Sequence, residues 1–126
     1  DEGTFQSRLV THAASLQRYS TYHPDRGELA VTHYRVLARS SELTHAVLRL
    51  ETGRRNQIRV HCAEAGHPVL GDPRYRPDLA CGPHWRAKRL ALHAATLAFA
   101  HPRTGERLRF SSPLPTEMAD LLKKMS

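Results

Sequence analysis

The 126 residues are enough for one domain with a single hydrophobic core, and no segment has the roughly 18 continuous apolar residues that a membrane-spanning helix needs. The net charge of +7 favours a polyanionic partner such as RNA or DNA, although charge alone leaves open a basic protein without such a partner. Two cysteines are too few for a disulfide framework, so we expect a reducing, intracellular compartment, the cytoplasm.

Residues 1–30 are polar and weakly patterned, and we expect them to be a lead-in that contributes little core. Leu9, Val10 and Leu16 are its main apolar side chains, and residues 23–27 are typical of a turn. From residue 31 the pattern sharpens. Apolar and polar residues alternate over 31–39 and again over 44–51, which predicts two antiparallel strands joined by a polar turn at 40–42.

The hydrophobic period becomes helical after residues 52 and 53. Ile58, Cys62 and Ala65 fall on one stripe, which predicts a helix over residues 56–65 that buries this stripe and ends at Gly66. Residues 73–87 contain several prolines and a glycine, and they are typical of a loop.

Two strands and a helix are predicted for the C-terminal third. Residues 90–99 indicate a strand, residues 101–105 a hairpin loop, and residues 108–110 the partner strand. The apolar stripe from Leu114 to Met125 predicts a final amphipathic helix with two lysines at its negative end. The whole sequence therefore predicts an α+β fold with a mixed, mostly antiparallel sheet and flanking helices.

The residues best suited to chemistry lie between 52 and 72. Arg54 and Arg55 stand where a helix N-terminus presents free N–H groups, and Arg59 follows about one turn later. Such a cluster is able to grip a phosphate or a carboxylate. From the residues alone, however, a solvated basic turn that caps the helix is the stronger interpretation.

A family resemblance changes that interpretation. Residues 52–61, T-G-R-R-N-Q-I-R-V-H, and residues 66–72, G-H-P-V-L-G-D, together resemble the last signature motif of the RluA-type RNA pseudouridine synthases. Further segments resemble family elements in the same order, at residues 32–37, 89–94, 97–102 and 112–115. The resemblance covers a family-like core over 31–126, and it implies that residues 1–126 are the C-terminal portion of a pseudouridine synthase catalytic domain.

The resemblance also implies roles for single residues. Arg59 resembles the family arginine that forms an ion pair with the catalytic aspartate and would keep that carboxylate ionised and oriented. Leu92 is expected either to line the apolar side of the uracil pocket or to belong to the core. Asp72 is expected to be a structural turn residue without a catalytic role. The border of the RNA cleft is expected to comprise Arg54, Arg55, Asn56 and Gln57.

Members of this family convert uridine to pseudouridine in RNA with one aspartate carboxylate and no metal ion or other cofactor. Large-subunit ribosomal RNA is the first expected substrate and tRNA the second. The family's H-R-L-D-x-x-[ST]-S-G motif, which carries the catalytic aspartate, does not occur in these 126 residues, and Glu51 in R-L-E-T-G is no substitute for it. We therefore expect a fragment of the synthase that is inactive alone, and the opening residues, which lack an initiator Met, agree.

Other possibilities stay open at this point. The main alternative function is a non-catalytic RNA-binding module derived from the same fold. The expected protein partner is the N-terminal half of the synthase or a second copy of this chain, joined through exposed sheet edges. A zinc site is not expected, because the spacing of Cys62, His67, Cys81 and His84 lacks the close ligand pairs of such sites.

Overall fold

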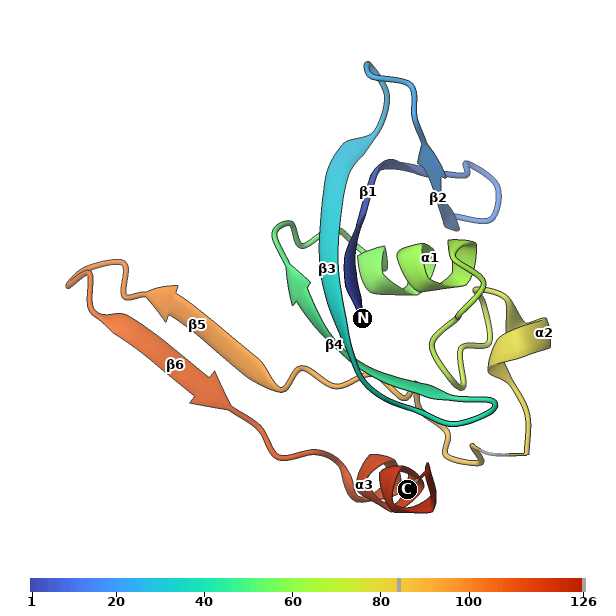
Figure 1. Ribbon diagram of the computed structural model, residues 1–126. Coiled ribbons are helices and arrows are strands. Elements are labelled where there is room, and N and C mark those ends of the chain that lie inside the picture. The colour runs from blue at the N-terminus through green and yellow to red at the C-terminus, as the bar shows by residue number, and fades with distance from the viewer. Residues whose placement is uncertain (84, 126) are drawn as a thin grey trace.

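The main sheet is antiparallel and has four strands within residues 1–83 and 85–125, the part of the chain that this computed structural model describes (Figure 1). Its strands are β1 (Glu2–Thr11), β2 (Arg18–Thr21), β3 (Glu28–Arg39) and β4 (Thr44–Leu50). They lie in the order β2-β1-β3-β4, so β1 and β3 occupy the centre of the sheet. Every pairing is antiparallel; short connections join β1 to β2 and β3 to β4, whereas β2 and its flanking loops separate β1 from β3 in the chain.

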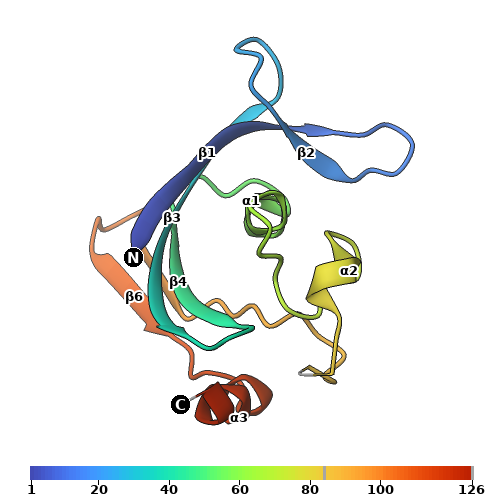
Figure 2. The same ribbon diagram turned by 45° about the vertical axis from the view of Figure 1, so that its right-hand side comes forward.

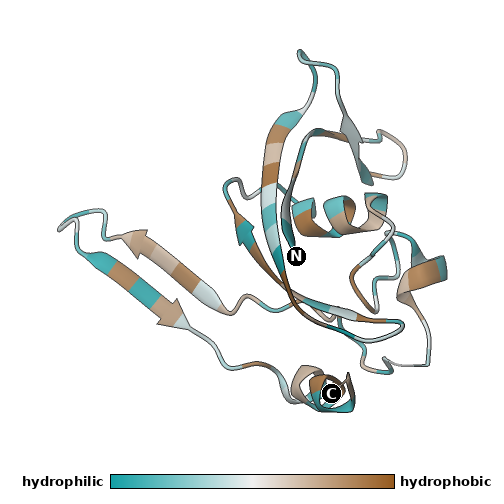
Figure 3. Cartoon of the chain, in the orientation of Figure 1, coloured by the Kyte–Doolittle hydropathy of each residue, from teal (hydrophilic) through white to brown (hydrophobic). Residues whose placement is uncertain are grey.

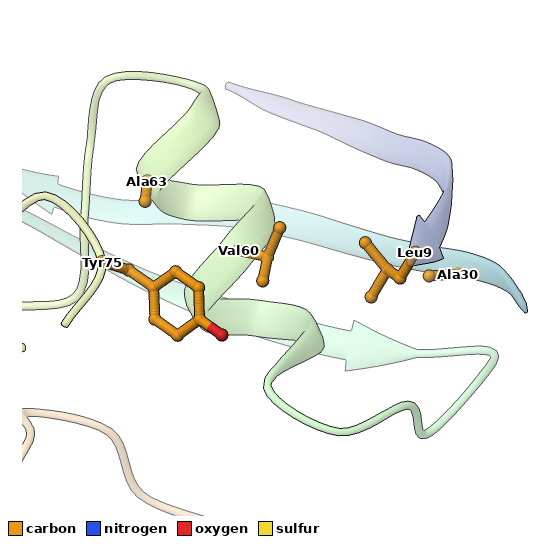
Figure 4. Packing of buried hydrophobic residues seen from close by; sticks show 5 residues of the cluster. All are labelled: Leu9, Ala30, Val60, Ala63 and Tyr75. Atoms are coloured by element: carbon orange, nitrogen blue, oxygen red, sulfur yellow. The ribbon is translucent and has the colours of Figure 1, made fainter. Parts of the chain in front are cut away.

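Helix α1 (Gln57–Glu64) lies against the concave face of this sheet, as both views show (Figures 1 and 2). The contact between them forms the hydrophobic core (Figure 4). A fully buried aliphatic side chain stabilises a fold by about 1.5–3 kcal/mol, so even a small cluster contributes substantially to the free energy of unfolding. The cluster consists of Leu9, Ala30, Val60, Ala63 and Tyr75.

The predicted strands over 31–39 and 44–51 are confirmed as β3 and β4, and their antiparallel pairing is confirmed as well. The register between them shifts between Val36 and Ala38, so an irregularity interrupts the ladder there. The predicted helix over 56–65 is α1, and the α+β class with mostly antiparallel strands is confirmed.

The expectation that residues 1–30 contribute little core is wrong. They form β1, β2 and the start of β3, and β1 is a central strand that pairs with both neighbours. Leu9 is fully buried in the core cluster, and Ser7 is buried as well. A buried serine looks like a surface residue in a hydropathy pattern, so the alternation along β1 was not visible in the sequence.

The stripe predicted to be buried on α1 is also wrong. Ile58 and Cys62 are half-buried and Ala65 is exposed. The buried residues of the helix are Gln57, Val60, His61 and Ala63. Two of these four are polar, and hydrogen bonds to the sheet make their burial tolerable, which the hydrophobic period does not report.

The C-terminal third differs from the prediction in detail. The loop at 73–87 contains a single helical turn, α2 (Pro77–Ala80), and the strand expected over 90–99 is reduced to β5 (Thr96–Ala100). The partner strand β6 (Arg107–Ser111) and the terminal helix α3 (Thr116–Met125) confirm the predicted hairpin and helix.

Strands β5 and β6 form a two-stranded ribbon that extends away from the main sheet (Figure 1). Leu97 pairs with Phe110 and Phe99 with Leu108, so these apolar side chains share one face of the ribbon. Figure 3 shows hydrophobic and hydrophilic segments alternating along β6. Leu97, Phe99 and Phe110 are 62%, 40% and 54% exposed. An isolated two-stranded ribbon is only marginally stable in water. Packing of this exposed apolar face against other residues would therefore stabilise the ribbon.

Candidate functional site

The turn between β4 and α1 is fixed from inside by Gln57. Its Oε1 accepts hydrogen bonds from Thr52 Oγ1 at 2.7 Å and from the N–H of Arg54 at 3.0 Å. Its Nε2 donates to the carbonyl of Val31 and to Thr32 Oγ1, at 3.0 and 2.9 Å. Gln57 was expected at the border of a cleft, but its side chain is 2% exposed and supports the turn from beneath.

Arg54 and Arg55 are both exposed, and they contact different segments, β3 and the loop between β1 and β2. Arg54 donates from Nε to the carbonyl of Leu29 at 3.0 Å, and Arg55 donates from Nη2 to the carbonyl of Leu16 at 3.0 Å. Carbonyl contacts leave the guanidinium charges uncancelled, although Nη1 of Arg54 also lies 3.6 Å from a Glu28 oxygen. Both arginines therefore keep N–H groups for an anion, while the charge of Arg54 is partly balanced by Glu28.

Arg59 and Asp72 form a two-pronged ion pair at the centre of the site. Arg59 donates from Nε to Asp72 Oδ2 and from Nη2 to Asp72 Oδ1, each at 2.8 Å. Its guanidinium carbon lies 5.0 Å from the centre of the Tyr75 ring, within reach of a cation–π interaction. Sequence reasoning assigned Asp72, the last residue of the G-H-P-V-L-G-D motif, only to the turn, and it missed Tyr75, three residues further on.

The two partners differ in exposure and in what their surroundings do to their pKa values. The Asp72 side chain is 0% exposed and that of Arg59 is 20% exposed. Burial by itself raises the pKa of Asp72, but the hydrogen bonds from Arg59 and from the N–H groups of Arg74 and Tyr75 hold the pKa below its usual range. The hydrogen bond to Asp72 raises the pKa of Arg59.

A buried polar network connects α1 to three strands beneath the site. Ring nitrogens of His61 lie 2.9 Å from Ser7 Oγ and 2.8 Å from Thr32 Oγ1, which belong to β1 and β3. Ser7 Oγ lies 2.8 Å from Ser20 Oγ on β2, and Ser20 donates to Glu64 at the end of the helix. Burial lowers the pKa of His61, so the ring is neutral at physiological pH and connects α1 to the sheet without a buried charge of its own.

Leu92 is half-buried in the irregular segment between α2 and β5. The segment lies beside the Asp72 turn, because the N–H of Ala91 donates to the carbonyl of Leu70 at 2.9 Å. Gly71 makes this close approach possible: it has a φ of +83°, and a Cβ there would stand 2.9 Å from the carbonyl oxygen of Arg89. The structure thus brings two motif segments together that are separated by about twenty residues in the sequence.

Within the described residues, no group of three or more His, Cys, Asp and Glu side chains is arranged to hold a metal ion, and His84 lies outside those residues. Burial raises the pKa of the Cys62 thiol to about 11, so this thiol stays protonated and is a poor nucleophile. Every helix in the described part of the chain is too short or too polar to cross a membrane.

Known proteins resemble this chain in sequence and in fold. The model of the RNA pseudouridylate synthase family matches residues 1–64. An uncharacterized RNA pseudouridine synthase of Bacillus subtilis is 46% identical, with 99% of this chain and 39% of that protein aligned. Ribosomal large subunit pseudouridine synthase D of Haemophilus influenzae is 40% identical, with 98% of this chain and 40% of that protein aligned. The chain thus spans about 40% of the length of these relatives.

The fold comparison points the same way. The solved structure of human RNA pseudouridylate synthase domain containing 1 superposes with a TM-score of 0.70 at 22% sequence identity. The superposition covers 98% of this chain and 59% of the human one. At this level of identity the likeness concerns the fold, and the residues that carry the chemistry have to be argued from the geometry above.

Proposed function

The chain belongs to the RNA pseudouridylate synthase family, and we propose that it forms part of an enzyme that converts uridine to pseudouridine within RNA. In this isomerisation the N1–C1′ glycosidic bond breaks, the uracil turns, and a C5–C1′ bond forms. The proton on C5 is lost and N1 gains one, so no other reactant is needed. The proposal rests mainly on the position of Arg59. Its guanidinium is held on α1 by the ion pair with Asp72, and its side chain is 20% exposed.

Arg59 is proposed to pair with the carboxylate of the catalytic aspartate. A neighbouring guanidinium favours the ionised form of an aspartate and fixes its direction, and both effects suit a carboxylate that acts on the target nucleotide. The aspartate motif itself does not occur in these 126 residues, so this chain alone should turn over no uridine. The aspartate is proposed to come from the rest of the synthase.

RNA is proposed to bind across the basic turn at the N-terminal end of α1. Arg54 and Arg55 offer exposed guanidinium groups there, and the chain as a whole carries a charge of +7. Contacts of this kind supply affinity through the phosphate backbone, which makes binding strongly dependent on salt. Large-subunit ribosomal RNA is the substrate we propose first, tRNA the second, and the cytoplasm is the proposed compartment.

A direct test measures pseudouridine in a ribosomal RNA transcript after incubation with this chain and with the full-length protein that contains it. We expect product from the full-length protein only, and Arg59→Ala in that protein should lower turnover to near background while RNA binding persists. The matched control is Arg76→Ala, because Arg76 also forms a two-pronged pair with a carboxylate, that of Asp78, but at the surface. Near-normal turnover of the Arg59 variant would remove Arg59 from the proposed role.

A non-catalytic RNA-binding module is the second candidate, and it is favoured by exposed arginines in a chain without the aspartate motif. It predicts salt-dependent RNA binding by the chain and no pseudouridine from the full-length protein either. Binding measured between about 50 and 200 mM salt should weaken steeply if phosphate contacts dominate. Activity in the full-length protein would leave this candidate without support.

The exposed apolar face of the β5–β6 ribbon is proposed to be covered by the remainder of the synthase. The chain aligns with 59% of the length of the solved human chain, so a large part of such a protein lies outside the matched region. The other proposed cover is a second copy of the chain. Sedimentation of the chain separates the two proposals. A monomer supports the first, in which the rest of the synthase covers the face, and a dimer supports the second.

A further inference from the structure

The Arg59–Asp72 pair is held far more firmly than a surface salt bridge. The carboxylate of Asp72 is fully buried, and its Oδ1 also accepts hydrogen bonds from the N–H groups of Arg74 at 2.9 Å and Tyr75 at 3.1 Å. Together with the two bonds from Arg59, these fix the carboxylate in one orientation. Breaking such a buried pair by removing one partner is strongly destabilising, which distinguishes it from an exposed pair.

The pair also determines which edge of the guanidinium faces outward. A guanidinium has five N–H groups, and Asp72 takes one on Nε and one on Nη2. A third, on Nη1, makes a 3.4 Å contact with Asn56 Oδ1, near the outer limit for a hydrogen bond. The end of the side chain has a second edge, formed by Nη1 and Nη2, and an edge of this kind suits a second carboxylate.

We propose that Asp72 is a positioning residue, which grips the Nε–Nη2 edge of Arg59 and so presents the Nη1–Nη2 edge to the catalytic aspartate. This inference rests on the proposed function, since it assumes the reaction that Arg59 serves. Tyr75 also helps to hold the guanidinium, because its ring lies 5.0 Å from the guanidinium carbon and its hydroxyl accepts a hydrogen bond from Asn56. Asp72 is thereby more than the turn residue that the sequence indicates.

The kinetic test uses the full-length protein and separates positioning from folding. We expect Asp72→Asn to lower kcat about 10- to 100-fold, because the catalytic aspartate would be less well oriented, and to change KM for RNA less than about twofold, because the Asp72 side chain is fully buried. The control is Asp78→Asn, which breaks an exposed two-pronged pair a few residues away and should leave both constants unchanged.

A double-mutant cycle decides whether Asp72 acts through Arg59. Arg59→Lys keeps the charge and loses the two-pronged geometry, and the double variant should be no slower than Arg59→Lys alone. Losses that multiply instead would overturn the inference, because they would mean that Asp72 works by another route. An unchanged kcat in Asp72→Asn would overturn it as well, while leaving the proposed function intact.

A second measurement needs no catalysis, and it uses a substitution at Arg59 only to assign the signal. In protein labelled with ¹⁵N-arginine, the Nε–H of Arg59, assigned from its absence in Arg59→Lys, should exchange slowly with water because Asp72 accepts its bond in a buried site. It should exchange fast in Asp72→Asn and stay slow in Asp78→Asn. Fast exchange in the unsubstituted protein would overturn the inference even if the full-length protein made no pseudouridine, a result that would refute the proposed function separately.

Discussion

Replacement of Thr32 by valine tests the polar network that holds α1 under the sheet. Thr32 is fully buried on β3, and its Oγ1 lies 2.8 Å from His61 Nδ1 and accepts a hydrogen bond from Gln57 Nε2 at 2.9 Å. Valine has nearly the same shape and replaces the hydroxyl by a methyl group, so packing is kept and both hydrogen bonds are lost. The change therefore reports the polar contribution of one oxygen atom.

The expected loss follows from which groups are left without a partner. Gln57 Nε2 keeps its bond to the carbonyl of Val31 at 3.0 Å, whereas the described residues offer His61 Nδ1 no replacement. A single buried polar group that loses its partner costs about 1–3 kcal/mol, and we expect Thr32→Val to lower the free energy of unfolding by that amount.

Thr4→Val is the matched control. Thr4 Oγ1 also lies 2.8 Å from a histidine Nδ1, that of His33, but this pair is exposed. Water replaces the lost partner there, so the free energy of unfolding should change by less than about 0.5 kcal/mol. Urea unfolding followed by circular dichroism measures both variants. Equal effects of the two substitutions would refute the reasoning, because burial would then make no difference to an otherwise similar contact.

Three further predictions concern pH, backbone conformation and thiol reactivity. Because burial lowers the pKa of His61, the unfolded state takes up a proton at a higher pH than the folded state does. Urea titrations should therefore show a free energy of unfolding that does not change with pH above about 6.5 and falls below it by up to about 1.4 kcal/mol per pH unit. His61→Gln should reduce this slope. Gly71→Ala should lower the melting temperature, since φ is +83° and the added Cβ has no room, whereas Gly82→Ala, with nothing within 4 Å, should not. A thiol reagent at pH 8 should modify exposed Cys81 well before Cys62, whose pKa is raised to about 11, and comparable rates would contradict the burial argument.

Local patterns predicted those elements whose residues follow a simple hydrophobic rule. The alternation along β3 and β4 and the helical period of α1 and α3 are short-range properties of the chain, and the structure has these elements close to the expected bounds. The same rule failed for β1, where the buried Ser7 breaks the apparent alternation. It also failed for the buried side of α1, where Gln57 and His61 take places that a hydropathy pattern gives to apolar residues.

The candidate site was predictable in part. The motif at residues 52–61 drew attention to Arg54, Arg55 and Arg59, and the structure places all three around the N-terminal half of α1 with some exposure. The partner of Arg59 within the chain was not predictable. Asp72 lies thirteen residues further on, and only the turn at Gly71 brings its carboxylate under the guanidinium.

The sequence by itself determined the class of fold, most of the regular elements and the arginines that are suited to an anionic partner, because these depend on residue type and short-range period. The tertiary structure alone decided which polar residues are buried and whom they bind. A buried Ser7, His61 or Asp72 is stable only when groups from distant segments satisfy its hydrogen bonds. Those partners come from distant parts of the chain, so a local sequence pattern does not predict them.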